Sequence, residues 1–177
     1  MKRALLLFLV LCGISTYTYS QKGDLYVGAK GGYITSYKDI VYGVRAGYHL
    51  TDQSELNFTY LMNPDIKMED DNNSLNNSKL SLYSFNLDFH YYIIMNRMWS
   101  MGPLLGGQYG IIKDDFYNNP LEDSDETKYW ALNVGWHIRF NIGENVKLNG
   151  GWRYAAATED MGHHMFYLGL GYTFSLY

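Results

Sequence analysis

The feature that most constrains the fold is a strict alternation of apolar and other residues over positions 129–140. One set of alternate positions is entirely apolar: Trp130, Leu132, Val134, Trp136, Ile138 and Phe140. The positions between them hold Tyr129, Ala131, Asn133, Gly135, His137 and Arg139. Because a period of two places the sets on opposite faces of a β-strand, this segment is predicted to be a strand with one apolar face.

The same alternation recurs in seven other segments along the chain. Their apolar sets are Leu25, Val27 and Ala29; Tyr42, Val44, Ala46, Tyr48 and Leu50; Leu56, Phe58, Tyr60 and Met62; Tyr83, Phe85, Leu87, Phe89, Tyr91 and Ile93; Met101, Leu105, Tyr109 and Ile111; Val146, Leu148, Trp152 and Tyr154; and Phe166, Leu168, Leu170, Tyr172, Phe174 and Leu176. Strands of about ten residues suit a tilted crossing of a bilayer. We therefore predict an all-β fold, an eight-stranded antiparallel up-and-down transmembrane β-barrel.

Charged side chains occupy the face opposite the apolar one. They are Lys30, Arg45, Glu55, Asp88, His90, Arg139, Lys147 and Arg153. A soluble eight-stranded barrel of the lipocalin type has the inverse pattern, with apolar side chains inside, and it remains the less favoured alternative. A helical membrane protein is excluded, because the mean hydropathy of -0.26 is too polar for one.

Two turns predict how neighbouring strands pair. Folding the chain about Asp52 pairs Tyr48 with Leu56 and Ala46 with Phe58, which keeps apolar residues opposite apolar residues. Folding it about Gly143 pairs Phe140 with Val146, Ile138 with Leu148 and Val134 with Trp152. A slip of one residue would turn each apolar set to the wrong face.

Short and long connections alternate along the chain. Residues 51–53, 96–98 and 143–145 are short links, whereas 63–79 and 113–127 are long and polar. This alternation is typical of barrels with periplasmic turns and extracellular loops, and an even strand number then places both termini in the periplasm. Pro103 cannot donate to the strand ladder, so a bulge is expected near it.

The N-terminal segment has the parts of a secretory signal. These are basic Lys2 and Arg3, the apolar stretch from Ala4 to Ile14, and the small residues Thr18 and Ser20. Cleavage before Gln21 divides the chain into a signal peptide, residues 1–20, and the barrel, residues 21–177. A lipoprotein site at Cys12 is the alternative, but Leu11 is large for the position before a lipidated cysteine. Cleavage before Gln21 leaves no cysteine in the mature chain.

The signal segment, the alternating strands and the final Tyr-Thr-Phe-Ser-Leu-Tyr resemble small outer-membrane barrels of the OmpX/OmpA-membrane-domain type. The glycine-rich run from Gly43 to Tyr48 resembles the outer-membrane β-barrel proteins of Bacteroidota, called porin family or PorT-like. The resemblance implies the outer membrane of a Gram-negative bacterium and a last strand recognised by the barrel-insertion machinery. Such a strand ends in an aromatic residue that belongs to the apolar set. Tyr177 is aromatic, but the apolar set ends at Leu176.

The inward charged set is the candidate site. It consists of Arg45, Glu55, Asp88, His90, His137, Arg139 and Arg153. An eight-stranded barrel is just wide enough for its own side chains, and charges buried there must pair and hydrogen-bond. We predict a structural charge network that fills the lumen, with inward glycines making room for it; a narrow pore is the alternative.

Other residues give weaker signals for chemistry. Outer-membrane palmitoyltransferase and lipid A deacylase barrels use His with Ser and an acidic residue, but no His–Ser pair here faces lipid near the outer rim, so no enzyme is expected. His163 and His164 are adjacent and lie close to Glu159 and Asp160, which is a weak metal signal. Acidic residues crowd the two long connections and could hold Ca²⁺, yet neither has the spacing of a calcium loop. We predict no catalytic, cofactor or metal site.

These observations favour a non-enzymatic integral outer-membrane barrel with a structural, surface-interaction or envelope-stabilising role. The alternative is transport or secretion, either as a small pore or as an accessory subunit of a larger outer-membrane complex. The expected partners are outer-membrane lipid and lipopolysaccharide, the insertion machinery, and an outer-membrane protein partner. The net charge of -4 argues against nucleic acid, which requires a clustered basic surface.

Overall fold

The computed structural model describes residues 22–67, 78–96, 98–116, 125–158 and 161–175. Its strands are β1 (Leu25–Ile34), β2 (Asp39–Thr51), β3 (Ser54–Lys67), β4 (Ser78–Tyr91), β5 (Ile94–Met95), β6 (Trp99–Phe116), β7 (Asp125–Asn141), β8 (Val146–Ala157) and β9 (His163–Phe174). None of the described residues forms a helix long and apolar enough to cross a membrane. The predicted signal peptide and the last two residues lie outside the described part.

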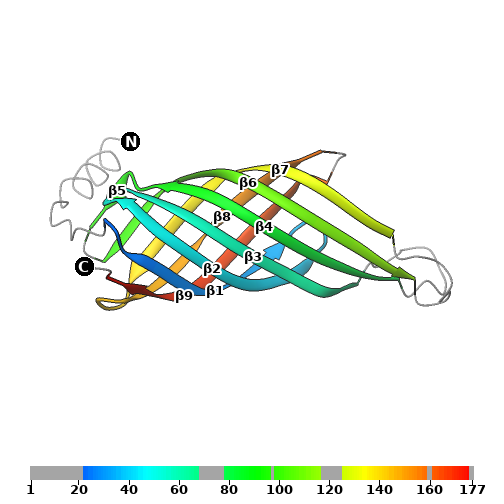
Figure 1. The fold of residues 1–177 in the computed structure, drawn as a ribbon, viewed down its shortest axis with the longest axis horizontal. Helices are drawn as coiled ribbons and strands as arrows, with labels where there is room; N and C mark the ends of the chain where they lie inside the picture. The colour runs from blue at the N-terminus through cyan, green and yellow to red at the C-terminus, as the bar shows by residue number, and fades with distance from the viewer. Residues whose placement is uncertain (1–21, 68–77, 97, 117–124, 159–160, 176–177) are drawn as a thin grey trace, which may run out of the picture.

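The long strands close into a barrel. Each pairs antiparallel with its neighbours, β1 pairs with β9, and β4 pairs directly with β6, so the sheet has no open edge along its shared length (Figure 1). The short β5 pairs only with the start of β6 and does not count as a further strand of the barrel wall. The predicted eight-stranded all-antiparallel barrel is therefore confirmed.

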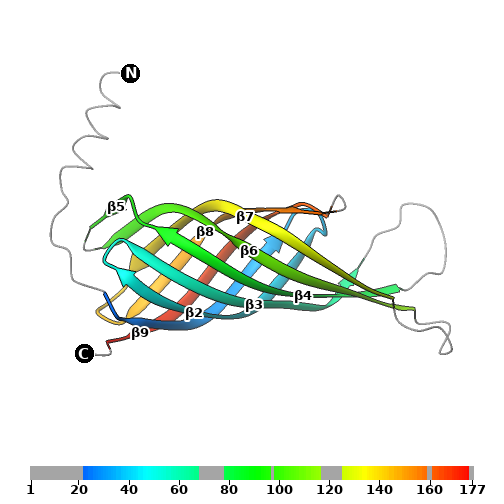
Figure 2. The same cartoon turned by 45° about the horizontal axis from the view of Figure 1, so that its top comes forward.

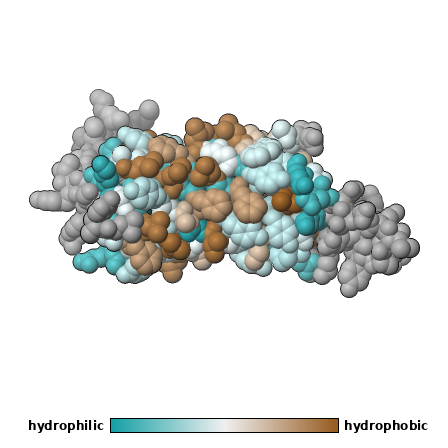
Figure 3. All heavy atoms as spheres, viewed as in Figure 1, coloured by the Kyte–Doolittle hydropathy of each residue, from teal (hydrophilic) through white to brown (hydrophobic). Residues whose placement is uncertain are grey.

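The two faces of the wall differ as the alternation predicts. On β7, Leu132 is 55% exposed and the next residue, Asn133, is 0% exposed. On the face that Figure 3 shows, apolar side chains gather across the middle of the molecule, and more hydrophilic residues lie towards both ends. Lipid would cover such a band in a membrane, so the exposed apolar residues form the outside of a bilayer-spanning wall.

One of the two predicted registers is confirmed and the other is wrong. Tyr48 pairs with Leu56 and Ala46 with Phe58, as predicted. However, Phe140 pairs with Leu148 instead of Val146, a shift of two residues. The β7–β8 turn is larger than predicted, and its Ile142 N–H donates to the Val146 carbonyl at 3.0 Å. A shift of two keeps every side chain on its own face, so the alternation could not detect it.

The same β7–β8 pairing corrects two further predicted partners. Ile138 lies opposite Gly150 instead of Leu148, and Val134 lies opposite Tyr154 instead of Trp152. Trp152 instead faces Trp136 across the ladder. The apolar faces nevertheless stay aligned, because all of these residues move by the same even number of positions.

The irregularity expected at Pro103 occurs in the segment that faces it. The β6–β7 register runs through Pro103 without a shift. On the other side of β6, His90 pairs with Leu104 while Ile94 pairs with Met101, so the β4–β5 segment contains one extra residue. A proline on β6 cannot donate a ladder bond towards that segment, which is where the regular pairing of β4 ends.

One side of the barrel is taller than the other. The pairing of β3, β4, β6 and β7 continues to Lys67, Ser78, Phe116 and Asp125, beyond the ends of the other strands. Figure 2 shows these strands projecting together past the β1–β2 and β8–β9 turns. We call this projecting part the extended wall. The predicted connections 63–79 and 113–127 were therefore too long, because paired strands satisfy their backbone groups without needing an apolar face.

Candidate functional site in the barrel lumen

Glu55 is the centre of a buried ionic cluster at the end of the barrel that carries the chain termini. Its Oε1 accepts a hydrogen bond from Arg45 Nη2 at 2.9 Å, and its Oε2 contacts the guanidinium of Arg139. Tyr92 OH donates to Oε2 at 2.9 Å, and His49 Nε2 lies 3.4 Å from the same oxygen. One buried carboxylate is thus held by two guanidinium groups, which is the strong, charge-assisted type of contact.

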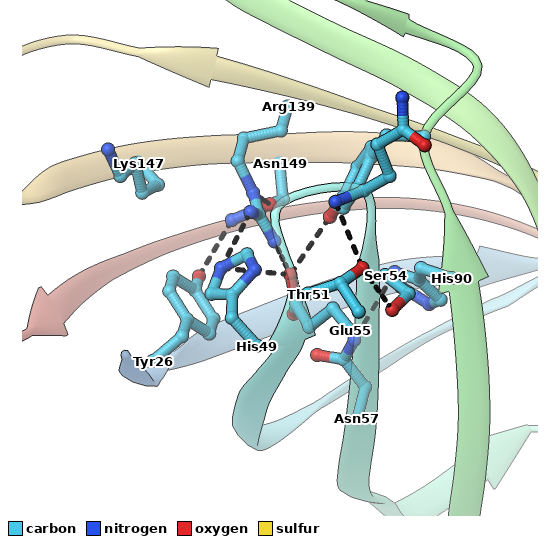
Figure 4. Close-up of polar contacts among 12 residues, drawn as sticks. Tyr26, His49, Thr51, Ser54, Glu55, Asn57, His90, Arg139, Lys147 and Asn149 are labelled. Atoms are coloured by element: carbon cyan, nitrogen blue, oxygen red, sulfur yellow. Dashed lines mark hydrogen bonds and ion pairs between the residues drawn. The ribbon is translucent and has the colours of Figure 1, made fainter. Parts of the chain in front are cut away.

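Neutral side chains complete this cluster, as Figure 4 shows. Arg45 Nε donates to Asn57 Oδ1, and the Asn57 amide lies 3.3 Å from His90 Nδ1. On the opposite side, Asn149 Nδ2 donates to Tyr26 OH at 2.7 Å. These partners satisfy donors and acceptors that would otherwise be costly to bury.

A second ionic cluster lies further along the lumen. Asp88 Oδ1 accepts a hydrogen bond from Asn133 Nδ2 at 2.8 Å. Arg153 Nη1 lies 3.5 Å from Asp88 Oδ2 and donates to Asn86 Oδ1 at 2.6 Å. The shorter bond of Arg153 is therefore the one to a neutral amide.

The seven residues of the predicted lumen network are all buried, but their direct ion pairs fall into two groups. Arg45, Glu55 and Arg139 form one group, and Asp88 with Arg153 forms the other. The two histidines lie against each other, with the ring centroids of His90 and His137 4.3 Å apart. We call the part of the lumen that contains these residues the charged half.

The other half of the lumen is apolar, which the sequence analysis did not predict. Its buried side chains are Ile34, Val41, Leu61, Ile66, Leu80, Leu82, Leu104, Tyr129, Ala131, Ala155, Met165 and Tyr167. Tyr37, in the β1–β2 turn, packs against this cluster, and its partial burial raises the pKa of its phenol. The missed signal was that both faces become apolar towards one end of several strands. We call this region the apolar half.

The two adjacent histidines point in opposite directions. His163 faces the lumen, where its Nδ1 lies 3.1 Å from the Met161 carbonyl. His164 faces outward and stacks against Trp152, with ring centroids 5.6 Å apart. Because successive side chains of a strand alternate in direction, these two cannot chelate one ion together.

The predicted acidic connections are only partly described. Asp65 lies in β3, Asp114 and Asp115 in β6, and Asp125 in β7. Glu126 on β7 lies 3.9 Å from Lys113 and 3.2 Å from Lys128. Residues 69–71 and 122–123, with Glu159 and Asp160, are outside the described residues.

A closed antiparallel barrel with an apolar outer band and buried ionic clusters in its lumen defines a small integral protein of the Gram-negative outer membrane. The chain belongs to the family described as outer membrane protein beta-barrel domain, which matches residues 4–174. Comparison with curated protein sequences gave no match.

Solved structures of small barrels are similar to this fold. The N-terminal β-barrel domain of Pseudomonas aeruginosa OprF matches with a TM-score of 0.63 and 19% identity over 86% of this chain and 98% of that one. Ail, the attachment invasion locus protein of Yersinia pestis, matches with a TM-score of 0.58 and 18% identity over 86% and 99%. OprG of Pseudomonas aeruginosa matches with a TM-score of 0.63 and 13% identity over 87% and 97%. At these identities the likeness shows the fold alone.

Proposed function

We propose that this protein is a non-enzymatic barrel that stabilises the envelope and presents its extended wall to partners at the cell surface. The observation that carries the proposal is the filled lumen. The ionic clusters and the apolar half occupy the space through which a solute would pass. An eight-stranded barrel is only wide enough for its own side chains. Partners would therefore bind to the outer wall and to the connections between strands, and not inside the lumen.

The extended wall supports the surface role. The paired strands continue beyond the rest of the barrel, on the side away from Lys22 and Ser175, where the described chain begins and ends. In the proposed orientation the termini are periplasmic, residues 1–20 are removed as a signal peptide, and this wall stands outside the cell. Ail, one of the similar barrels, is named for attachment and invasion. We include in this proposal that the protein is a relative of the porin-family or PorT-like barrels of Bacteroidota.

Lipid is the first proposed partner. On the outward face, the rings of Tyr109 and Trp130 lie against each other at a tilt of 47°, with centroids 4.8 Å apart. Lys128 lies two residues before Trp130 on the same face. Aromatic rings favour the interface of a membrane, and lysines beyond them can reach headgroup phosphates. This arrangement suits contact with outer-membrane lipid and lipopolysaccharide.

The test is capture of partners from the native outer membrane in mild detergent, followed by mass spectrometry. Wild-type protein is compared with a variant in which residues 64–81 and 113–126 are replaced by tight turns. We expect the wild type to retain a surface or envelope partner that the shortened variant loses. The opposite finding, capture of a large secretion or transport complex by both proteins, would overturn the surface role and favour the accessory function.

A further inference from the structure

The extended wall has two side edges, one on β3 and one on β7. The β2–β3 pairing reaches Met62 of β3, and the β7–β8 pairing reaches Ala131 of β7. Beyond these points, residues 63–67 of β3 and 125–129 of β7 have a ladder partner on one side only among the described residues. We call these segments the β3 edge and the β7 edge. A strand with one free side presents unpaired N–H and C=O groups that can pair with another chain.

The β3 edge is blocked by its own sequence. Pro64 has no N–H to offer, and its carbonyl accepts a hydrogen bond from Ser81 Oγ at 3.0 Å. The next N–H, that of Asp65, donates to Asn63 Oδ1 at 2.9 Å, and the β3–β4 register shifts between Asn63 and Ile66. Proline and a bulge are usual means of preventing pairing at a sheet edge. The β3 edge is therefore poorly suited to take up another strand.

The β7 edge has neither a proline nor a bulge. Its register with β6 runs without a shift as far as Asp125. The side chains of Glu126, Thr127 and Lys128 are all exposed, although they alternate between the outward and inward faces of the wall. The β7 edge is therefore a regular strand that another chain can reach.

Two hydrogen bonds fix which backbone groups of β7 face the open side. Asn141 N–H donates to the Met98 carbonyl on the β6 side, and the Trp130 carbonyl accepts from the N–H of Thr158, just after β8. The direction alternates from residue to residue along an antiparallel strand. Odd-numbered residues of β7 thus face β6, and even-numbered residues face the other side. The N–H and C=O groups of residues 126 and 128 therefore point to the open side.

We propose that the β7 edge binds an extended segment of another protein as an added antiparallel strand. The added strand would lie in line with β8, beyond Ala157, and would exchange backbone hydrogen bonds with Glu126 and Lys128. This inference rests on the proposed function, because the edge meets partners only if the extended wall stands outside the cell.

The two faces of the β7 edge define the chemistry of the bound segment. On the outward face, an acidic side chain opposite Lys128 and a basic one opposite Glu126 would form cross-strand ion pairs. On the inward face, the apolar Ala157 and Met161 are partly buried, so a small or β-branched residue fits between the two charges. A second barrel in the same membrane cannot supply this strand, because its own β7 would have to run in the opposite direction.

The test uses the full-length barrel in detergent and a synthetic peptide with the sequence of residues 125–130, in which Glu-Thr-Lys has the required order of charges. Amide hydrogen exchange followed by NMR reports each residue of the edge separately. In the free barrel, the N–H groups of Glu126 and Lys128 should exchange rapidly, whereas those of Thr127 and Tyr129, which face β6, should be protected. Peptide at about ten times its Kd should slow exchange at Glu126 and Lys128 roughly tenfold.

Matched controls separate strand addition from other kinds of binding. Methylation of the peptide's Glu and Lys amide nitrogens, which would face β7, should abolish the protection, and methylation of its Thr nitrogen should preserve it. In the barrel, Lys128→Pro removes an N–H on the open side without removing a bond to β6, so it should abolish binding. Lys128→Gln keeps that N–H and should weaken binding by no more than about fivefold.

Three results would overturn the proposal. The first is slow exchange of Glu126 and Lys128 in the free barrel, which would show that the edge is already covered. The second is a peptide that gives no protection, and the third is equal peptide binding by wild type and Lys128→Pro. In the capture experiment above, a partner retained equally by wild type and Lys128→Pro would also reject the β7 edge, but it would leave the surface role in place.

Discussion

Both halves of the lumen are filled by side chains, but the charged half uses ion pairs and the apolar half uses aliphatic packing. In the charged half, guanidinium groups cross the lumen to reach carboxylates, as Arg139 on β7 reaches Glu55 on β3. In the apolar half, aliphatic side chains such as Leu61 and Met165 pack as in the core of a soluble protein. Lipid contacts only the outer face of the wall, so the membrane does not determine whether the lumen is charged or apolar.

The boundary between the halves shows how they are joined. Arg153 contacts Asp88 on one side and the Met165 sulfur on the other, with Nη2 3.6 Å from that sulfur. Gln108 adds a polar contact to the apolar half by donating to Tyr129 OH at 2.9 Å. The charged half fixes which strands face each other through specific pairs, whereas the apolar half excludes water without directional bonds.

The largest effect should come from the centre of the charged half. Glu55→Gln removes the carboxylate that holds Arg45 and Arg139, so two buried guanidinium groups lose their counter-ion. We expect the free energy of unfolding, measured by urea titration in detergent, to fall by about 3–5 kcal/mol. Glu126→Gln is the matched control: its lysine partners are exposed, and the loss should stay below about 1 kcal/mol. Equal losses in both variants would show that the charged half is solvated.

The apolar half should respond to loss of volume. Leu82→Ala leaves a cavity in the lumen and should lower the unfolding free energy by about 2–5 kcal/mol. Leu87 lies on the same strand but faces lipid, so acyl chains can fill the space left by Leu87→Ala. The same urea titration should therefore show a smaller loss for Leu87→Ala, because the cavity term is absent. A larger loss at Leu87 would contradict the assignment of the two faces.

The sequence predicted which face each side chain occupies better than it predicted strand registers and contacts across the lumen, and the reasons are physical. Alternation assigns faces, so the lipid-facing band and the burial of Arg139 followed from it. Alternation cannot detect a shift of two residues, which is why the β7–β8 register was wrong, whereas the tight turn at Asp52 left little choice for β2–β3. The partner of each charge was not predictable, because Arg153 on β8 meets Asp88 on β4 across the lumen. The apolar half was missed because inward positions were expected to be polar throughout.

The smallest of these effects is expected at the second ionic cluster. Asp88→Asn removes a charge whose distance to Arg153 is 3.5 Å, but Arg153 keeps its 2.6 Å bond to Asn86. We expect a loss of about 1.5–3 kcal/mol in the unfolding free energy, the usual range for a hydrogen bond to a charged group. The comparison with Glu55→Gln ranks the clusters, and a loss at Asp88 that exceeded the loss at Glu55 would reverse that ranking.

Ion conductance of the wild-type barrel in planar lipid bilayers is the most direct test of a lumen filled by its own side chains. We expect inserted protein to leave the current at the baseline of the bare bilayer, because both halves of the lumen are packed. Insertion would be verified on the same membranes by the difference in gel migration between unboiled and boiled samples, which a closed barrel shows. A steady open-channel current from verified, folded protein would contradict a filled lumen and support a transport function.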